Sequence, residues 1–549
     1  MNWRNKIIEW DVSVTPWPIP DHSVHCCVTS PPYYRLRSYK ISPSVWGGEA
    51  GCAHEWGQSL PGDSRGGSGT PTDKNGRGEE YARAVERGRV CGKCGAWEGC
   101  LGLEPSLDLY IENIVRVFRE VRRVLRPDGV TWLNLGDGFS TDPGNGRGQE
   151  TVWGGKPNRS AMDKGGCGVK NKDLIGMPWR VALALQVDGW WLRSDVIFSK
   201  MNPLPEALSG WRWERHRVKT GRAPVDWSLA PKSWNYGEGA HNGIPEGNYR
   251  KVGDPGATVA VWADCPGCEK CESNEGYVLR CGSWRPTRAH EYVFMLTASE
   301  NYFCDSYAVR EPASAASLKR INQKSFDLQM GGEKDYRNGV NTSRSARKTL
   351  ENFVANPGRN PRDVWHLALE GSDENHYATY PTKLIEPCIK SSISSYGCCA
   401  VCGMPWVPVI ERAILPPVDR VNNNQFKHDD TTTHGEGGST LRNRIEKNCI
   451  GWRASCRCGT PDKSRCVVLD PFMGSGTTAI VARRLGADFV GLEKKGEYIE
   501  IARRRLAERE GAMFREEEDG STKEHEWDTK EEERQPQITQ ISADEEGGE

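Results

Sequence analysis

The feature that most restricts the fold is a strand–helix–strand–helix unit near the end of the chain. Residues 467–469 form a short apolar run, and helical spacing follows at residues 477–485. A second apolar run, residues 489–492, ends at Glu493, and a second helical pattern covers residues 498–508. This alternation is typical of a parallel sheet with helices on its faces. We therefore predict an α/β fold.

The loop after the first of these strands, Asp470-Pro-Phe-Met-Gly-Ser-Gly-Thr-Thr478, contains two glycines. Glycine lets the backbone approach a ligand closely, here at the positive end of a helix. A phosphate-binding loop is disfavoured because no lysine follows the glycines. Glu493 ends the next strand, where a ribose hydroxyl pair would be gripped. Taken alone, the loop can also be interpreted as a plain tight turn.

A second motif, Ser30-Pro31-Pro32-Tyr33, directly follows an apolar run at residues 24–28. Its two prolines fix the backbone and prevent a helix or strand from continuing. Oxygen atoms of Ser30 and Pro31 can accept both hydrogens of an amino group, which favours a pyramidal nitrogen with an available lone pair. Tyr33 offers a face on which a flat ring can stack. By itself, this motif could also be an ordinary loop.

Further elements are predicted from periodicity and from turn residues. Residues 7–11 read as a strand, whereas residues 203–375 show no clear strand–helix alternation. Between the motifs we predict a helix over 107–126 that ends at Pro127-Asp128-Gly129, strands over 130–135, 190–197 and 291–296, and helices over 178–187 and 382–392.

Together, the two motifs resemble the DNA amino-methyltransferases, the family that modifies cytosine N4 or adenine N6. The family's (Asp/Asn/Ser)-Pro-Pro-(Tyr/Phe) motif matches residues 30–33, and its Phe-x-Gly-x-Gly motif matches residues 472–476. The catalytic motif comes first, which resembles the permuted beta group. The resemblance implies a doubly wound, permuted methyltransferase sheet. It covers roughly residues 1–40, 101–210, 284–305 and 360–395, and the segment after 466.

The resemblance also implies the cofactor and the site residues. We expect S-adenosylmethionine as the cofactor and catalysis by Ser30, Pro31, Pro32 and Tyr33. Asp11, at the end of the opening strand, would contact the adenine of the cofactor. The complete set of expected cofactor-binding residues is Asp11, Thr29, Asp470, Pro471, Phe472, Gly474, Ser475, Gly476, Thr477 and Glu493.

We expect the N4 of cytosine as the target, because serine at the first motif position is commoner for that base in this family. Adenine N6 is the alternative target. Methylation at C5 would need a nucleophilic cysteine, and Cys388 lies inside a predicted helix, where a small buried side chain is expected. The same motifs would also suit an RNA or protein amine methyltransferase, or an inactive zinc-dependent nucleic-acid-binding protein. The long insertions, sized like a target-recognition domain, favour DNA.

The chain has 20 cysteines, many of them in closely spaced groups. The N-terminus has no apolar leader, so we interpret these groups as zinc ligands rather than disulfides, with free thiols as the alternative. Cys398 could replace Cys399 in the second group. The three expected sites are Cys52, His54, Cys91 and Cys94; Cys399, Cys402, Cys456 and Cys458; and Cys265, Cys268, Cys271 and Cys281.

The charges nearly cancel, with 73 Lys and Arg against 74 Asp and Glu. Binding to DNA needs only a local basic surface, so we still expect double-stranded DNA as the partner. No apolar run is long enough to span a membrane, and we expect a cytoplasmic protein of a prokaryotic or phage-infected cell. A cognate restriction enzyme and the oligomeric state stay open.

The expected domains follow from the motifs and the insertions between them. They are a catalytic half (1–40 and 101–210), two zinc-ribbon-like insertions (41–100 and 396–465), a target-recognition region (211–375), a cofactor-binding half (376–395 and 466–510) and a disordered acidic tail (511–549).

Overall fold

The computed structural model describes residues 3–35, 39, 41–60, 88–140, 169–170, 172–203, 210–224, 258–311, 359–368, 380–415 and 444–518. The chain divides into two compact units. The first comprises Met1–Phe198, Glu291–Trp365 and Tyr380–Glu549, and the second comprises Ser199–His290 and His366–Thr379. Among the described residues, no helix is both long enough and apolar enough to cross a membrane.

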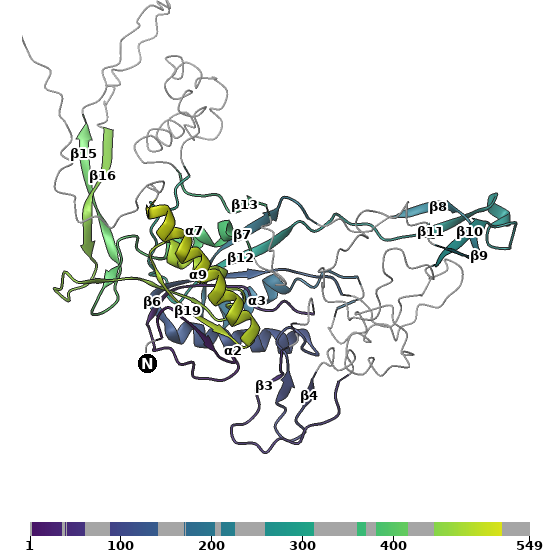
Figure 1. The fold of residues 1–549 in the computed structure, drawn as a ribbon, viewed down its shortest axis with the longest axis horizontal. Coiled ribbons are helices and arrows are strands. Elements are labelled where there is room, and N and C mark those ends of the chain that lie inside the picture. The colour runs from purple at the N-terminus through teal and green to yellow at the C-terminus, as the bar shows by residue number, and fades with distance from the viewer. Residues whose placement is uncertain are drawn as a thin grey trace, which may run out of the picture. The chain divides into compact units, whose positions relative to one another are not determined.

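An eight-stranded sheet runs through the first unit (Figure 1), in the order β1, β19, β18, β2, β6, β12, β7, β13. Neighbours from β1 to β6 are parallel, and β12 is antiparallel to β6. The predicted parallel α/β sheet is therefore confirmed. The strands are β1 (Lys6–Glu9), β2 (Val24–Thr29), β6 (Leu125–Leu135), β7 (Trp191–Lys200), β12 (His290–Thr297), β13 (Val364–Leu367), β18 (Val467–Asp470) and β19 (Asp488–Glu493).

Helices cover both faces of this sheet. Leu133 of β6 belongs to the apolar core that α2 and α3 share, whereas the neighbouring Trp132 donates its indole hydrogen to Ser392 Oγ of α7, 2.8 Å away. Because successive strand residues point to opposite faces, α2 and α7 lie on opposite sides of β6. The helices are α2 (Leu107–Val124), α3 (Met177–Val187), α7 (Thr382–Ser392), α8 (Thr477–Arg484) and α9 (Gly496–Glu518).

Two predicted boundaries were wrong. The turn expected at residues 127–129 does not form, because β6 begins at Leu125, directly after α2. Arg126 holds this stretch by an ion pair with Asp128, 2.8 Å away, and by donating to the carbonyl of Cys402 at 2.7 Å. The last helix extends past residue 508 to Glu518, so residues 511–518 are not part of a disordered tail. Residues 519–549 lie outside the described residues.

The insertions form small antiparallel sheets. In the first insertion, β3 (Ser44–Trp46) and β4 (Arg89–Val90) flank β5 (Trp97–Gly99). In the second, β14 (Cys398–Cys399) pairs with β17 (Lys463–Ser464), and β15 (Trp406–Leu415) pairs with β16 (Arg444–Ala454). The second unit contains two ribbons and a 3₁₀ turn: β8 (Trp211–Arg215) with β11 (Tyr277–Cys281), β9 (Arg217–Pro224) with β10 (Thr258–Asp264), and η4 (Glu272–Asn274).

A buried carboxyl group, Glu104, lies next to the Ser-Pro-Pro-Tyr loop. It accepts hydrogen bonds from the backbone of Gly102 at 2.8 Å and from the side chain of Asn113 at 3.2 Å. A Cβ at Gly102 would lie 3.1 Å from the carbonyl oxygen of Tyr33, so this segment packs tightly against the loop. Burial raises the pKa of Glu104 to about 7, against the lowering effect of these hydrogen bonds.

Glu104 should make the stability of the protein fall as the pH rises. The ordinary glutamate pKa of about 4.3 lies below the folded value, so between the two the folded chain holds a proton that the unfolded chain has lost. This difference removes roughly 3 kcal/mol from the free energy of unfolding between about pH 5 and pH 8. Glu104→Gln should abolish this part of the pH dependence. Denaturant titrations of both proteins at the two pH values measure it, and equal pH dependence would contradict the prediction.

Candidate active site and cofactor loop

The Ser-Pro-Pro-Tyr motif leaves the carboxyl end of β2 and is fixed by the core. The hydroxyl of Tyr110 on α2 donates to the carbonyl of Pro32 at 2.9 Å, and the backbone of Arg35 donates to the carbonyl of Gly102 at 2.6 Å. The ring of Tyr33 lies against the backbone just after β6, because a Cβ at Gly136 would come within 2.6 Å of it. The loop is therefore held on several sides before any ligand binds.

Two residues that the sequence did not single out complete a polar cluster with Ser30 and Tyr33. Asn134, on β6, donates its amide hydrogens to the Tyr33 hydroxyl at 2.8 Å and to Glu291 Oε2 at 2.9 Å. The hydroxyl of Ser30 donates to that of Tyr33 at 3.1 Å, and Tyr33 donates to Glu291 at 2.8 Å. Burial, followed by the charge of Glu291, raises the pKa of Tyr33 well above its ordinary value. The Tyr33 hydroxyl therefore stays protonated and acts as a donor.

The side-chain oxygen of Asn134 is a buried acceptor that has no partner among the described residues. An acceptor without a partner in a protein interior is costly, and such atoms call for an explanation. Here the atom belongs to the side chain that contacts both Ser30 and Tyr33.

The glycine loop joins β18 to α8 and has the backbone that its sequence requires. Gly474 and Gly476 have φ values of 52° and 83°, in the left-handed region that favours glycine. A Cβ at Gly476 would lie 2.8 Å from that of Ala502 on α9. Arg505, also on α9, donates to the carbonyl of Ser475 at 2.6 Å and to its hydroxyl at 2.7 Å. Arg505 was not predicted from the sequence.

Asp470 lies beneath this loop and is almost fully buried. Its carboxylate accepts from Thr29 at 2.7 Å, Thr478 at 2.7 Å, Tyr380 at 2.9 Å and the backbone of Phe472 at 3.0 Å. Burial raises its pKa above the ordinary value, although these hydrogen bonds act in the opposite direction. The bond to Thr29 makes the glycine loop and the Ser-Pro-Pro-Tyr loop neighbours. The expected roles of Asp470 and Thr29 at the cofactor stay predictions.

Two carboxylates lie where the neighbouring strands β1 and β19 end. Glu493 accepts from the backbone of Gly474 and of Lys495, both at 2.9 Å, and burial raises its pKa. Asp11 forms an ion pair with Lys494 and accepts from Ser44, both at 2.8 Å. Burial tends to raise the pKa of Asp11, but the bonds from Lys494, Ser13 and Ser44 bring it below its ordinary value.

These features fit S-adenosylmethionine. Glu493 is bonded to the backbone of Gly474 at the edge of the sheet where a ribose diol would be gripped. Among the other expected cofactor residues, Ser475 and Thr477 are buried and Phe472 packs against the core. Their roles at the cofactor, and that of Pro471, stay predictions.

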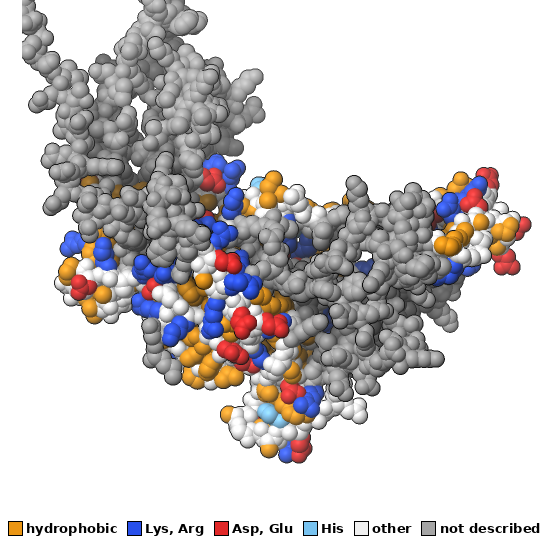
Figure 2. All heavy atoms as spheres, viewed as in Figure 1, with side chains coloured by type: hydrophobic (Ala, Val, Ile, Leu, Met, Phe, Trp, Pro, Cys, Tyr) orange, Lys and Arg blue, Asp and Glu red, His pale blue; other side chains and the backbone are white. Residues whose placement is uncertain are grey.

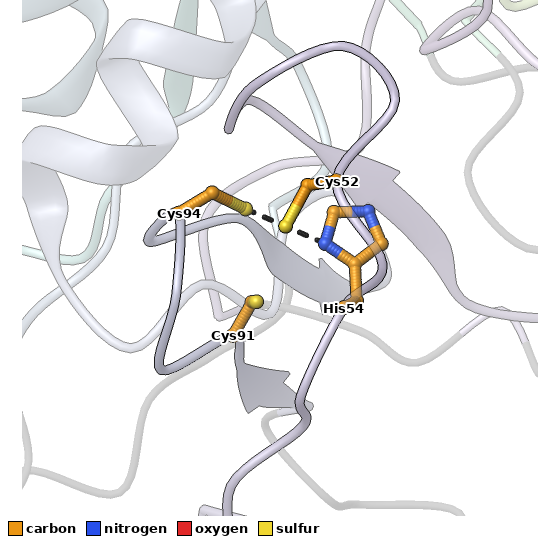
Figure 3. Close-up of side chains that lie close together, drawn as sticks. All are labelled: Cys52, His54, Cys91 and Cys94. Atoms are coloured by element: carbon orange, nitrogen blue, oxygen red, sulfur yellow. Dashed lines mark hydrogen bonds between the residues drawn. The ribbon is translucent and has the colours of Figure 1, made fainter.

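Four groups of potential metal ligands occur among the described residues, three of them with four members, and in each group all ligand atoms lie within 4.8 Å of one another. Two match the predicted sets in full: Cys52, His54, Cys91 and Cys94, whose side chains converge in Figure 3, and Cys399, Cys402, Cys456 and Cys458. The predicted third set was wrong in one member. His216 joins Cys265, Cys268 and Cys271, whereas Cys281 is exposed on β11, opposite Trp211.

A further group, His25, Cys398 and Cys466, was not predicted and does not fit a metal. The backbone of Val467 donates to His25 Nδ1 at 3.1 Å, so Nδ1 carries no hydrogen. The other nitrogen, Nε2, is then protonated and donates to the carbonyl of Gly403 at 2.9 Å. Both ring nitrogens are engaged, and His25 joins β2 to the start of β18 and to the loop between Cys402 and β15.

Comparison with known proteins identifies the family. The model of the DNA methylase family, which covers N6- and N4-methyltransferases, matches residues 24–398 and 459–504. Type II methyltransferase M.Cfr9I of Citrobacter freundii is 24% identical over 89% of this chain and 83% of its own length. M.XycI of Xanthomonas campestris pv. cyanopsidis is 24% identical over 91% and 87%. The chain therefore belongs to the N6/N4 DNA methylase family and is an S-adenosylmethionine-dependent DNA methyltransferase.

Proposed function

We propose that this enzyme methylates the N4 amino group of cytosine in double-stranded DNA. The observation that carries the proposal is the unpartnered oxygen of Asn134 beside Ser30 and Tyr33, next to the glycine loop. A neutral amino group fits these acceptors. Ser30 at the first motif position supports cytosine over adenine, in line with the family pattern.

The residues of the loop would make a weak nucleophile reactive. The lone pair of an exocyclic amine is delocalised into its ring, and hydrogen bonds to Asn134 Oδ1 and to the Pro31 carbonyl would favour a pyramidal nitrogen. S-adenosylmethionine supplies the methyl group, bound to a positively charged sulfur. The amine nitrogen would displace the sulfur from the methyl carbon and would then release one proton to solvent. Tyr33 and Glu291 position the base.

We also propose that the three complete ligand groups each hold a structural zinc ion. In each group all four ligand atoms lie within 4.8 Å of one another, which is the compact arrangement that a tetrahedral zinc site needs. The relatives are Type II methyltransferases, and we infer that this chain protects DNA against a partner endonuclease.

The product identifies the target base. Purified enzyme is incubated with labelled S-adenosylmethionine and unmethylated DNA, which is digested to nucleosides and analysed by mass spectrometry. We expect N4-methylcytosine. N6-methyladenine would overturn the choice of base and leave the enzyme class intact. Label in RNA or protein but not in DNA would refute the proposed substrate.

Asn134→Ala should lower kcat roughly hundredfold, because the loop loses an acceptor and the contacts that hold Ser30 and Tyr33. Tyr33→Phe keeps the ring and removes only the hydroxyl, so its loss should be smaller. Cofactor affinity, measured by calorimetry, should be unchanged in both. Equal activity of Asn134→Ala and wild type would contradict the assignment.

Glu493→Ala should weaken S-adenosylmethionine binding by roughly ten- to a hundredfold, the usual effect of losing hydrogen bonds to a charged group. Glu497→Ala is the matched control, because this nearby glutamate on α9 is exposed and pairs with Lys495. Calorimetric titration of both variants measures the effect. Equal affinities in the two variants would remove Glu493 from the cofactor site.

A further inference from the structure

The second unit contains a long two-stranded arm with a sharp interruption. The outgoing side is β8, His216 and β9, and the returning side is β10, residues 265–276 and β11. At the interruption, the single residue His216 lies opposite a loop of the returning side, residues 265–276. The backbone of His216 donates to the carbonyl of Gly276, and its carbonyl accepts from the backbone of Cys265, both at 2.8 Å. A loop of this length needs an interaction that holds its two ends together.

The arm has no apolar core to provide that closure. Among its described residues, 210–224 and 260–281, Cys271 is the one buried side chain, with 1% of its surface exposed. A two-stranded ribbon alone is marginally stable in water. The loop of residues 265–276 therefore depends on an interaction other than the burial of apolar surface.

Four side chains at the interruption have the geometry of a zinc site. Cys268 Sγ lies 3.8 Å from Cys271 Sγ and 3.4 Å from His216 Nδ1, and Cys265 completes the group. Two sulfurs bound at about 2.3 Å in a tetrahedron would be separated by about 3.8 Å. This spacing is that of ligands around one ion.

One face of the arm combines cationic and aromatic side chains. Along the outgoing side, alternate positions carry Trp211, Trp213, Arg215, Arg217 and Lys219. The guanidinium groups of Arg215 and Arg217 lie 3.3 and 3.4 Å from the same carboxylate, that of Asp264, so both point to one face. The returning strands add Trp262, opposite Lys219, and Tyr277, opposite Arg215.

These aromatic groups are exposed without a packing role in the arm. Trp211, Trp213 and Trp262 have 70%, 54% and 56% of their surface exposed, and Figure 2 shows hydrophobic and basic side chains side by side at this end of the second unit. The outgoing side contributes Arg215, Arg217 and Lys219 to this face, against one carboxylate there, that of Asp264. Such a surface complements a polyanion, with cations for phosphates and flat rings for sugars and bases.

We propose that a zinc ion bound by His216, Cys265, Cys268 and Cys271 fixes this arm, and that its Trp/Arg/Lys face binds the DNA duplex. The inference rests on the proposed DNA substrate. The metal has a structural role: it fixes the pairing of the arm's strands. The contacts to DNA come from side chains on those strands.

The first test measures the metal in the full-length protein. Cys268→Ser should lose one equivalent of zinc relative to wild type by elemental analysis. It should also bind a mixed-sequence DNA duplex more than about tenfold more weakly, because the ordered phosphate contacts are lost. Its affinity for S-adenosylmethionine should be unchanged. Unchanged zinc content would overturn the site.

The second test compares the two faces of the arm. Arg217→Ala/Lys219→Ala removes two cations from the proposed face, and Arg212→Ala/Arg280→Ala removes two from the opposite face, where both residues pair with Glu214. Measured by fluorescence anisotropy, the first variant should reduce the dependence of log Kd on log salt by about 1.8. The second should leave it near the wild-type value.

Equal losses in both variants, or none in the first, would overturn the proposed face. Wild-type enzyme that binds S-adenosylmethionine but neither binds nor methylates DNA would instead refute the proposed function. The two failures are therefore distinguishable.

Discussion

The site depends on one buried carboxylate, that of Asp470. Its four donors include Thr29 at the end of β2, Thr478 in α8 and Tyr380 just before α7. Burying a carboxylate is expensive unless its oxygens are fully hydrogen-bonded, so all of these donors must be in place together. The same bonds fix the distance between the glycine loop and the Ser-Pro-Pro-Tyr loop. Chemistry between a cofactor and a base needs that distance to be constant.

Outside the sheet, the insertions have little apolar surface to bury, so they need another source of stability. Cysteine and histidine ligands occur where each insertion begins and ends: Cys399 and Cys402 precede β15, and Cys456 and Cys458 follow β16. A metal ion at such a point replaces a core, because its binding free energy contributes to folding. Arg126 and His25 then fasten this module to the sheet through the carbonyls of Cys402 and Gly403.

Local patterns predicted the helices and every strand of the sheet except β13, because side-chain periodicity is a short-range property. Partners that are distant in the sequence were not predictable: Glu291 lies 258 residues from Tyr33. Asn134 carried a usable signal, an amide in the otherwise apolar last four residues of β6, 132–135. The predicted ligand set of the third metal site was wrong for a related reason. Spacing favoured Cys281, but the pairing of β11 with β8 carries it away from the cluster, and His216 takes its place.

The chemistry and the proposed recognition surface therefore depend on different forces. Around the motif, Tyr110, Glu104 and Asn113 are buried, so a change in any of them affects stability as well as geometry. On the arm, Trp213 and Lys219 are exposed and support no core. Substitutions there cost little folding free energy, because nothing packs behind them. Substitutions on the proposed DNA-binding face would therefore alter the affinity for DNA while the distances at the catalytic loop stay the same.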